Sequence, residues 1–311
     1  MIPPAEPVKI FTMALLLALL MLAPLWANPV QTRSGLVEGR QEGGVRIFLG
    51  IPYAAPPVGD LRWRPPQPPE KWSGVRAARE YSPACMQARP ASFATSEDCL
   101  TLNIWTPAQA ARLPVMVWIH GGAYANGSGA LPLYDGARLA KNRVVVVTLN
   151  YRLNDFGFFA HPELSREQKG AMLGNYGLMD QIAALEWVKH NIAAFGGDPG
   201  NVTIFGESAG GGSVLCLMVS PVARGLFHRA AVQSGAGSTG SRTLAALEAS
   251  GVKRAREWGA ASLAGMRKLP ARDIVAKPAP GGLTAHSPAV DGVLLTDSVA
   301  VTLTLGATDV Y

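Results

Sequence analysis

The chain has 311 residues, of which 48% are hydrophobic and 16% charged, a balance that excludes a disordered chain and provides for one sizeable core. Its 28 Lys and Arg against 22 Asp and Glu give a formal charge of +6, but no basic run is interleaved with aromatic residues. We therefore interpret the excess charge as a solvated surface and expect no nucleic-acid partner.

The N-terminus has the pattern of a secretory signal peptide. An apolar run at residues 11–23 follows a lysine, and Pro24 and Ala27 come directly after it. The run is too short for a comfortable membrane span. We predict a signal peptide over residues 1–27, a mature domain over residues 28–311, a secreted or periplasmic location and no stable membrane span after cleavage. An uncleaved N-terminal anchor is the alternative.

Short β-branched runs alternate with a helical pattern along the mature chain. This alternation predicts an α/β fold with a mostly parallel central sheet flanked by helices, and no second domain. A helix is expected over residues 179–191, where apolar residues recur at helical spacing. The Pro-rich residues 52–69 and 277–288 are expected to be surface loops. The predicted strands are residues 45–51, 100–105, 115–119, 144–149, 202–205 and 230–233.

The strand at residues 115–119 leads into His120, Gly121 and Gly122. Glycines at the end of a buried strand let peptide N–H groups approach a substrate oxygen closely, so Gly121 and Gly122 are candidate oxyanion-binding residues. We expect His120 to shape this loop, because a general base must face the nucleophile from another loop.

Ser208 is the candidate nucleophile. It lies between a predicted strand and a small-residue helix, within Gly206-Glu207-Ser208-Ala209-Gly210. A serine at such a turn has a strained backbone, and the residues two before and two after it must be small. The helix points its free N–H groups, that of Ala209 first, to the space where negative charge develops during acyl transfer. An ordinary glycine-rich turn is the alternative.

Together these motifs resemble the type-B carboxylesterases, the cholinesterase and bacterial carboxylesterase branch of the α/β-hydrolases. The resemblance covers nearly all of the predicted mature chain and implies an α/β-hydrolase fold, ester hydrolysis through an acyl-enzyme on Ser208, a small ester substrate and no cofactor or metal. Further matching segments are Ile51-Pro52-Tyr53-Ala54, Glu97-Asp98-Cys99-Leu100, Asn150-Tyr151-Arg152-Leu153 and Asn175-Tyr176-Gly177-Leu178.

The resemblance also implies structural pairs. These are a disulfide between Cys85 and Cys99, and buried ion pairs of Arg62 with Glu97 and of Arg152 with Asp180. A disulfide persists in an oxidising compartment, in agreement with a signal peptide. The remaining cysteine, Cys216, is expected to be a buried small hydrophobe, and the three cysteines show no metal-ligand spacing. The tyrosine at position 124, in place of phenylalanine, is interpreted as a minor variation.

The base and acid for the nucleophile are expected beyond residue 311. In this fold the acid and then the histidine follow the serine, so we interpret the sequence as a truncated esterase whose sheet is incomplete on its C-terminal side. We expect the strands at residues 202–205 and 230–233 to be left with an exposed apolar edge and face. His228 is expected to be structural. His286 with Asp273, which preserves this order, or with Asp291 is an alternative triad. A non-catalytic binding or adhesion module, or an inactive fragment, is the alternative function.

Overall fold

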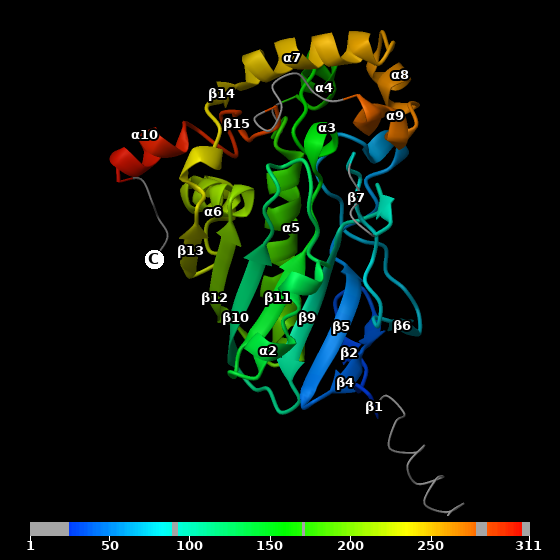
Figure 1. The fold of residues 1–311 in the computed structure, drawn as a ribbon, viewed down its shortest axis with the longest axis vertical. Coiled ribbons are helices and arrows are strands. Elements are labelled where there is room, and N and C mark those ends of the chain that lie inside the picture. The colour runs from blue at the N-terminus through cyan, green and yellow to red at the C-terminus, as the bar shows by residue number, and fades with distance from the viewer. Residues whose placement is uncertain (1–24, 89–92, 170–171, 278–284, 307–311) are drawn as a thin grey trace, which may run out of the picture.

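An eight-stranded sheet runs through the computed structural model, which describes residues 25–88, 93–169, 172–277 and 285–306 (Figure 1). Each of the six predicted strands overlaps one of its strands, which confirms those predictions. In spatial order the strands are β1 (Leu25–Trp26), β4 (Arg40–Glu42), β5 (Val45–Pro52), β9 (Thr101–Pro107), β11 (Val145–Leu149), β10 (Leu113–Ile119), β12 (Gly197–Glu207) and β13 (Arg229–Gln233).

The sheet is mixed, and the predicted parallel pairing holds only for its C-terminal half. β10 is parallel to β11 and β12, and β12 is parallel to β13. From β1 through β4, β5 and β9 to β11 the neighbours are antiparallel. β4 and β5 are joined by Gly43 and Gly44, whose φ values are 55° and 79°. A two-residue connection of this kind joins only antiparallel neighbours, which explains the direction of β4 relative to β5.

Helices pack on both faces of the sheet. The predicted helix at residues 179–191 is confirmed as α5 (Tyr176–Asn191), which packs on β12 beside α6 (Ala209–Val219). The short α2 (Ala137–Ala140) packs against β5, β9 and β11. Val146 of β11 packs with Ala140 of α2, whereas its neighbours Val145 and Val147 belong to the core that includes α5. Because successive strand residues point to opposite faces, α2 and α5 lie on opposite sides of the sheet.

A layer of helices lies across the end of the sheet where β12 runs into α6 (Figure 1). Three of these helices begin at side-chain caps: His161 Nδ1 accepts from Glu163 N at 3.2 Å, Thr243 Oγ1 from Ala246 N at 3.3 Å, and Ser262 Oγ from Gly265 N at 3.1 Å. None of them was predicted. The helices are α3 (Asn154–Gly157), α4 (Pro162–Glu167), α7 (Leu244–Glu257), α8 (Leu263–Arg267) and α9 (Ala271–Ala276).

Small elements complete the described chain. A second sheet contains β2 (Val30–Gln31), β3 (Leu36–Glu38) and β6 (Val75–Ala77), and two further pairs are β7 (Ala84–Cys85) with β8 (Thr95–Ser96) and β14 (Arg242–Thr243) with β15 (Ala289–Val290). The helix α10 (Val299–Thr304) follows and packs on α6.

The Pro-rich residues 52–69 are only in part the surface loop that their composition predicted: Val58, Asp60 and Gln67 are exposed, but the middle of the segment is not. Trp63 is fully buried, and its indole N–H donates to the carbonyl oxygen of Asp155 at 2.7 Å. Its ring stacks on Trp258, with 6.1 Å between the ring centroids. The aromatic and arginine side chains of this segment therefore draw it into the core, although its prolines prevent regular structure. Most of the second predicted loop, residues 277–288, lies outside the described residues.

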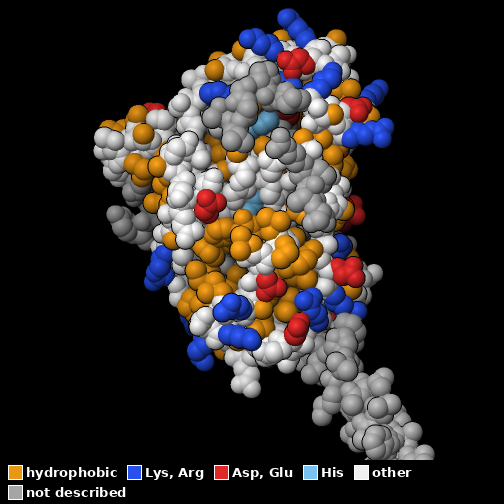
Figure 2. All heavy atoms as spheres, viewed as in Figure 1, with side chains coloured by type: hydrophobic (Ala, Val, Ile, Leu, Met, Phe, Trp, Pro, Cys, Tyr) orange, Lys and Arg blue, Asp and Glu red, His pale blue; other side chains and the backbone are white. Residues whose placement is uncertain are grey.

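One edge and part of one face of the sheet are exposed. β13 is the last strand of the sheet, and its Val232 is 38% exposed. Hydrophobic side chains gather on the face shown in Figure 2. This confirms the predicted exposure for residues 230–233. For residues 202–205 the prediction is wrong in part, because Val202 and Ile204 are fully buried.

Most of the predicted signal peptide, residues 1–24, lies outside the described residues. Its last residues are described: Leu25 and Trp26 form β1 and pair with Gln41 and Arg40 of β4. The boundary at Ala27 stays a prediction. Within the described ranges, none of the helices combines the length and the hydrophobicity needed to cross a membrane.

Candidate active site

Ser208 occupies the turn between β12 and α6, with φ 55° and ψ −124°. This confirms the predicted strained conformation at a strand-to-helix junction. A Cβ at Gly210 would lie 2.1 Å from the carbonyl oxygen of Ile119, and one at Gly206 would lie 2.6 Å from the backbone of Gly210. The two glycines are therefore required for α6 to start directly against the end of β10.

The main chain of Ser208 is fixed on two sides. Its N–H donates to the carbonyl oxygen of Gln233 in β13 at 2.8 Å, and its carbonyl oxygen accepts from the N–H of Gly212 at 2.9 Å. Ala209 is buried and begins α6, so its N–H has no partner within the helix. The positive end of the helix dipole therefore lies at Ser208, where it favours negative charge.

The segment of residues 120–127, here called the oxyanion loop, packs against this turn. A Cβ at Gly121 would lie 3.1 Å from the Cβ of Ser208 and 2.6 Å from the carbonyl oxygen of Glu207. Gly122 has a φ of 109°, and its carbonyl oxygen accepts from Asn126 N at 2.9 Å. The structure thus brings Gly121 next to Ser208 and folds Gly122 into the adjoining turn. Their role as oxyanion donors stays a prediction.

His120 is buried inside the oxyanion loop. Its Nδ1 lies 2.8 Å from the carbonyl oxygen of Gly121, and its ring stacks on Tyr151 with 4.4 Å between centroids. Burial lowers the pKa of His120 to about 4, although the hydrogen bond to Gly121 opposes this change. The imidazole is therefore neutral at pH 7, and its Nδ1–H donates to Gly121. These contacts support the interpretation that His120 shapes the loop.

The two histidines that follow Ser208 have other partners. His228 lies just before β13, where its imidazole Nδ1 accepts from Val202 N at 3.2 Å and its main-chain N–H donates to Val202 O. His286 Nε2 lies 3.4 Å from Asp155 Oδ1. No histidine of the described chain forms a hydrogen bond with Ser208.

The alternative triad through His286 is therefore wrong. Asp273 is exposed and lies 3.7 Å from Arg272, and Asp291 Oδ1 accepts from the N–H groups of Val293, Leu294 and Leu295. Both carboxylates thus contact residues next to them in sequence and not His286. The order of these residues in the sequence could not show this.

A buried cluster of Asp155, Arg254 and His286 joins α3 to α7. Arg254 Nη2 donates to Asp155 Oδ2 at 2.6 Å. Burial alone would raise the pKa of Asp155, but the hydrogen bonds and charges of His286 and Arg254 outweigh it and hold that pKa below its usual value. The cluster was not predicted, because Asp155 and Arg254 are 99 residues apart in sequence and match no local motif.

The implied structural pairs are present. Cys85 and Cys99 form a disulfide with 5.0 Å between their Cα atoms, and Cys216 is free and buried. Asp180 Oδ1 and Oδ2 accept from Arg152 Nη2 and Nε at 2.7 and 2.8 Å, and both side chains are buried. The disulfide closes the loop of residues 85–99, and the ion pair joins the residues after β11 to α5.

Arg62 joins the N-terminal part of the chain to α8. Its Nε and Nη2 donate to the two carboxylate oxygens of Glu97 at 2.7 and 2.6 Å. Its Nη1 donates to the carbonyl oxygens of Met266 and Leu269 at 3.2 and 2.8 Å. Arg62 therefore caps the C-terminal end of α8 while Glu97 balances its charge. The resemblance implied the ion pair but not the cap.

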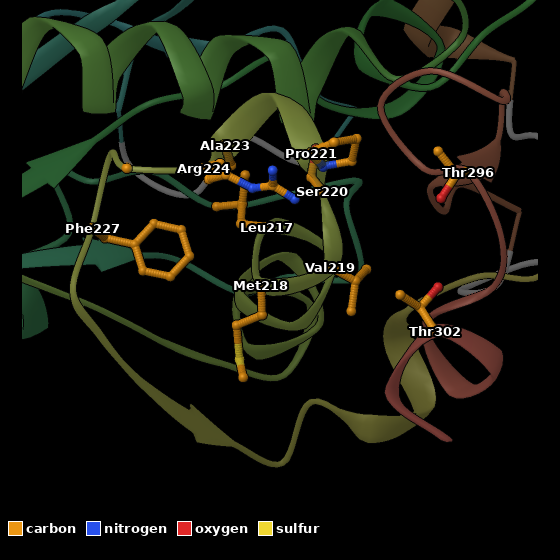
Figure 3. Close-up of a pocket in the computed structure, with 11 residues that line it drawn as sticks. Leu217, Met218, Val219, Ser220, Pro221, Ala223, Arg224, Phe227, Thr296 and Thr302 are labelled. Carbon is orange, nitrogen blue, oxygen red and sulfur yellow. The ribbon is translucent and has the colours of Figure 1, made fainter. Parts of the chain in front are cut away.

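A cavity of about 200 Å³ lies between the last turn of α6 and α10 (Figure 3). Its lining includes Met218, Ser220 and Thr302. Met218 is ten residues beyond Ser208 on the same helix, which corresponds to about 15 Å along the helix axis. The cavity is thus at the far end of the nucleophile helix and does not serve Ser208.

Comparisons with known proteins agree with this geometry. The model of the carboxylesterase family matches residues 27–306. The fumonisin B1 esterase of Sphingopyxis macrogoltabida is 47% identical over 279 residues, covering 85% of this chain and 51% of the relative. The para-nitrobenzyl esterase of Bacillus subtilis is 50% identical over 228 residues, covering 70% and 45%.

Solved structures of similar proteins have the same fold. A PNB esterase superposes with a TM-score of 0.83 at 43% identity, over 90% of this chain and 61% of that chain. A carboxylesterase of Geobacillus stearothermophilus gives a TM-score of 0.83 at 46% identity, over 90% and 59%. The chain spans about half the length of the curated relatives it matches. With the α/β-hydrolase fold and the serine turn described above, the chain belongs to the carboxylesterase family.

Proposed function

We propose that the protein is a carboxylic ester hydrolase that works through an acyl-enzyme on Ser208. The observation that carries the proposal is the position of Ser208, with φ 55°, at the start of α6 and directly against Gly121. A strained serine between a helix N-terminus and a glycine loop is suited to nucleophilic attack, because both can stabilise an oxyanion.

In the first step Ser208 Oγ attacks the ester carbonyl carbon and gives its proton to a base. The negative oxygen of the tetrahedral intermediate accepts from the N–H groups of Gly121, Gly122 and Ala209, each worth roughly 3–4 kcal/mol in the transition state. The alcohol then leaves with a proton, and water hydrolyses the acyl-enzyme by the same route.

The proposal assigns the base and the acid to residues outside the described part of the chain. It is supported by the partners of His120, His228 and His286, which bind the oxyanion loop, Val202 and Asp155. This assignment also agrees with the match to the fumonisin B1 esterase, which covers 51% of that relative. An acyl-enzyme forms slowly without such a base, since a serine hydroxyl alone is a poor nucleophile.

Small aryl or alkyl esters are the proposed substrates. The loop between Cys85 and Cys99 contains no tryptophan, which argues against choline esters. One relative is named a fumonisin B1 esterase and another a para-nitrobenzyl esterase, and the second name agrees with a small aromatic ester. The proposed location is secreted or periplasmic, a compartment that would preserve the Cys85–Cys99 disulfide.

The test is hydrolysis of p-nitrophenyl acetate with covalent labelling of Ser208 by a fluorophosphonate. Residues 28–311 should hydrolyse the ester only slowly, with the residual rate constant of about 10³–10⁴ over water that oxyanion donors and binding alone provide. A chain extended through the downstream reading frame should gain turnover and labelling. Ser208→Ala should abolish both, and Ser220→Ala, a buried serine just past the far end of α6, should preserve both.

Two results would contradict the proposal. Robust Ser208-dependent turnover by residues 28–311 alone would show that the base lies within this chain. An extended chain that folds but neither turns over esters nor reacts with the fluorophosphonate would favour the non-catalytic binding module.

A further inference from the structure

The oxyanion loop has a backbone conformation that its own residues do not favour. Ala123 and Tyr124 both have a φ of 55°, in the left-handed region where a side chain is strained. They follow Gly122, which has a φ of 109°. Such a loop keeps its shape only where contacts outside it over-determine its position.

The side chain of Tyr124 supplies a contact of this kind. It is buried, and its hydroxyl donates to the carbonyl oxygen of Ser238 at 2.7 Å. Its ring packs on Phe158 with 4.8 Å between centroids. A Cβ at Gly212 would lie 2.7 Å from the tyrosine oxygen, so the hydroxyl lies directly over the first turn of α6.

Ser238 belongs to the segment of residues 233–238, and Ser208 is hydrogen-bonded to the same segment. Gln233, at one end of this segment, accepts from the N–H of Ser208 at 2.8 Å. Ser238, at the other end, accepts from Tyr124. Between them a Cβ at Gly235 would lie 2.3 Å from the backbone of Gly211 in α6. The nucleophile and the oxyanion loop are thus attached to the two ends of one short segment packed on α6.

A second tyrosine holds the loop on its other side. The hydroxyl of Tyr151 donates to the carbonyl oxygen of His120 at 2.8 Å. The glycine pair therefore lies between two fixed points, with His120 before it and Tyr124 after it. Among the hydrogen bonds of the described residues, that of Tyr124 alone joins the oxyanion loop to residues 233–238.

We propose that Tyr124 is a positioning residue for ester hydrolysis: its hydroxyl sets the N–H groups of Gly121 and Gly122 relative to Ser208 by joining the oxyanion loop to residues 233–238. The inference rests on the proposed function. A phenylalanine would fill the same space but leave the carbonyl oxygen of Ser238 without this donor. The tyrosine oxygen alone therefore distinguishes the two side chains in how they hold the oxyanion loop.

The experiment compares Tyr124→Phe with Tyr53→Phe. Tyr53 also donates from a buried hydroxyl to a backbone carbonyl, that of Asn150, at 2.6 Å, so the control removes a matched bond. Amide hydrogen exchange is measured over the whole chain, together with thermal unfolding. Tyr124→Phe should raise exchange about fivefold to tenfold in residues 121–126 and 235–239, with no such rise in residues 145–149.

Tyr151→Phe gives a second, directional readout. It should raise exchange in residues 120–123 but not in 235–239, because its hydroxyl contacts only the start of the loop. Unchanged exchange in Tyr124→Phe, or an even rise across the chain as expected for a purely structural loss, would overturn the proposal. This arm does not depend on whether Ser208 is a nucleophile.

Kinetics form the second arm, in the extended chain once Ser208→Ala has been shown to abolish turnover. Tyr124→Phe should lower kcat for p-nitrophenyl acetate about tenfold and leave KM within about twofold, because misplaced donors act on the transition state. Unchanged kcat alongside raised exchange would refute the positioning role. If the extended chain without substitutions shows no Ser208-dependent turnover, the proposed function is refuted instead.

Discussion

Replacing Asp180 with asparagine should remove the charge that balances Arg152. Asp180 accepts three hydrogen bonds from that residue: from its Nε at 2.8 Å, its Nη2 at 2.7 Å and its main-chain N at 2.9 Å. The side chains are 0% and 3% exposed, so water cannot replace the lost carboxylate. A buried guanidinium without its partner costs about 3–5 kcal/mol of unfolding free energy. For a chain of this size we expect the melting temperature to fall by about 6–10 °C.

Urea and thermal unfolding, followed by circular dichroism, measure this effect. Glu42→Gln is the control, because its pair with Arg40 lies at the surface and should contribute less than about 1 kcal/mol. The double change Arg152→Met with Asp180→Leu should destabilise less than Asp180→Asn alone, since it leaves no buried charge. A shift for Asp180→Asn as small as that of the control, or a double variant that equals the sum of its single changes, would refute the reasoning.

Three further predictions concern pH, redox state and solubility. His120 has a pKa of about 4 in the fold and about 6.5 when unfolded, so its contribution to the free energy of unfolding is complete above pH 6.5. That free energy should fall by up to about 3 kcal/mol as the pH is lowered toward 4, and an imidazole that titrates near 6.5 by NMR would contradict this. Cys85→Ala with Cys99→Ala should cost about 3 kcal/mol in urea unfolding, and reductant should no longer affect the variant. Val232→Lys should reduce light scattering at unchanged melting temperature, because it charges the exposed strand β13; scattering equal to the unmodified chain would locate the association surface elsewhere.

The strands and the serine turn could be predicted because their signals are local. β-branched runs mark residues 115–119 and 202–205, and the flanking glycines of Ser208 meet a steric need that follows from the turn itself. The direction of the strands could not be predicted, since a β-branched run looks the same in a parallel and an antiparallel sheet. Only the Gly43-Gly44 pair carried that information, as a two-residue hairpin.

The helices over the site and the partners of its side chains depend on distant contacts. α7 begins at the capping residue Thr243, a local signal that could have revealed it. The hydrogen bond of Tyr124 to Ser238 spans 114 residues, and no local pattern contains it. The tyrosine in place of phenylalanine, first interpreted as a minor variation, was the only trace of this bond in the sequence.

The contact of Arg62 with the end of α8 has a consequence for how the chain acquires its fold. The residues it joins are 204 to 207 positions apart, so α8 lacks its C-terminal cap until most of the sheet has been made. Closing so long a loop is slow, because the chain loses conformational entropy before the contact of Arg62 can stabilise it. The helices α7 to α9 should therefore dock last during synthesis and open first under native conditions. A protease added to the folded protein should cut there before it reaches the strands that hold Ser208.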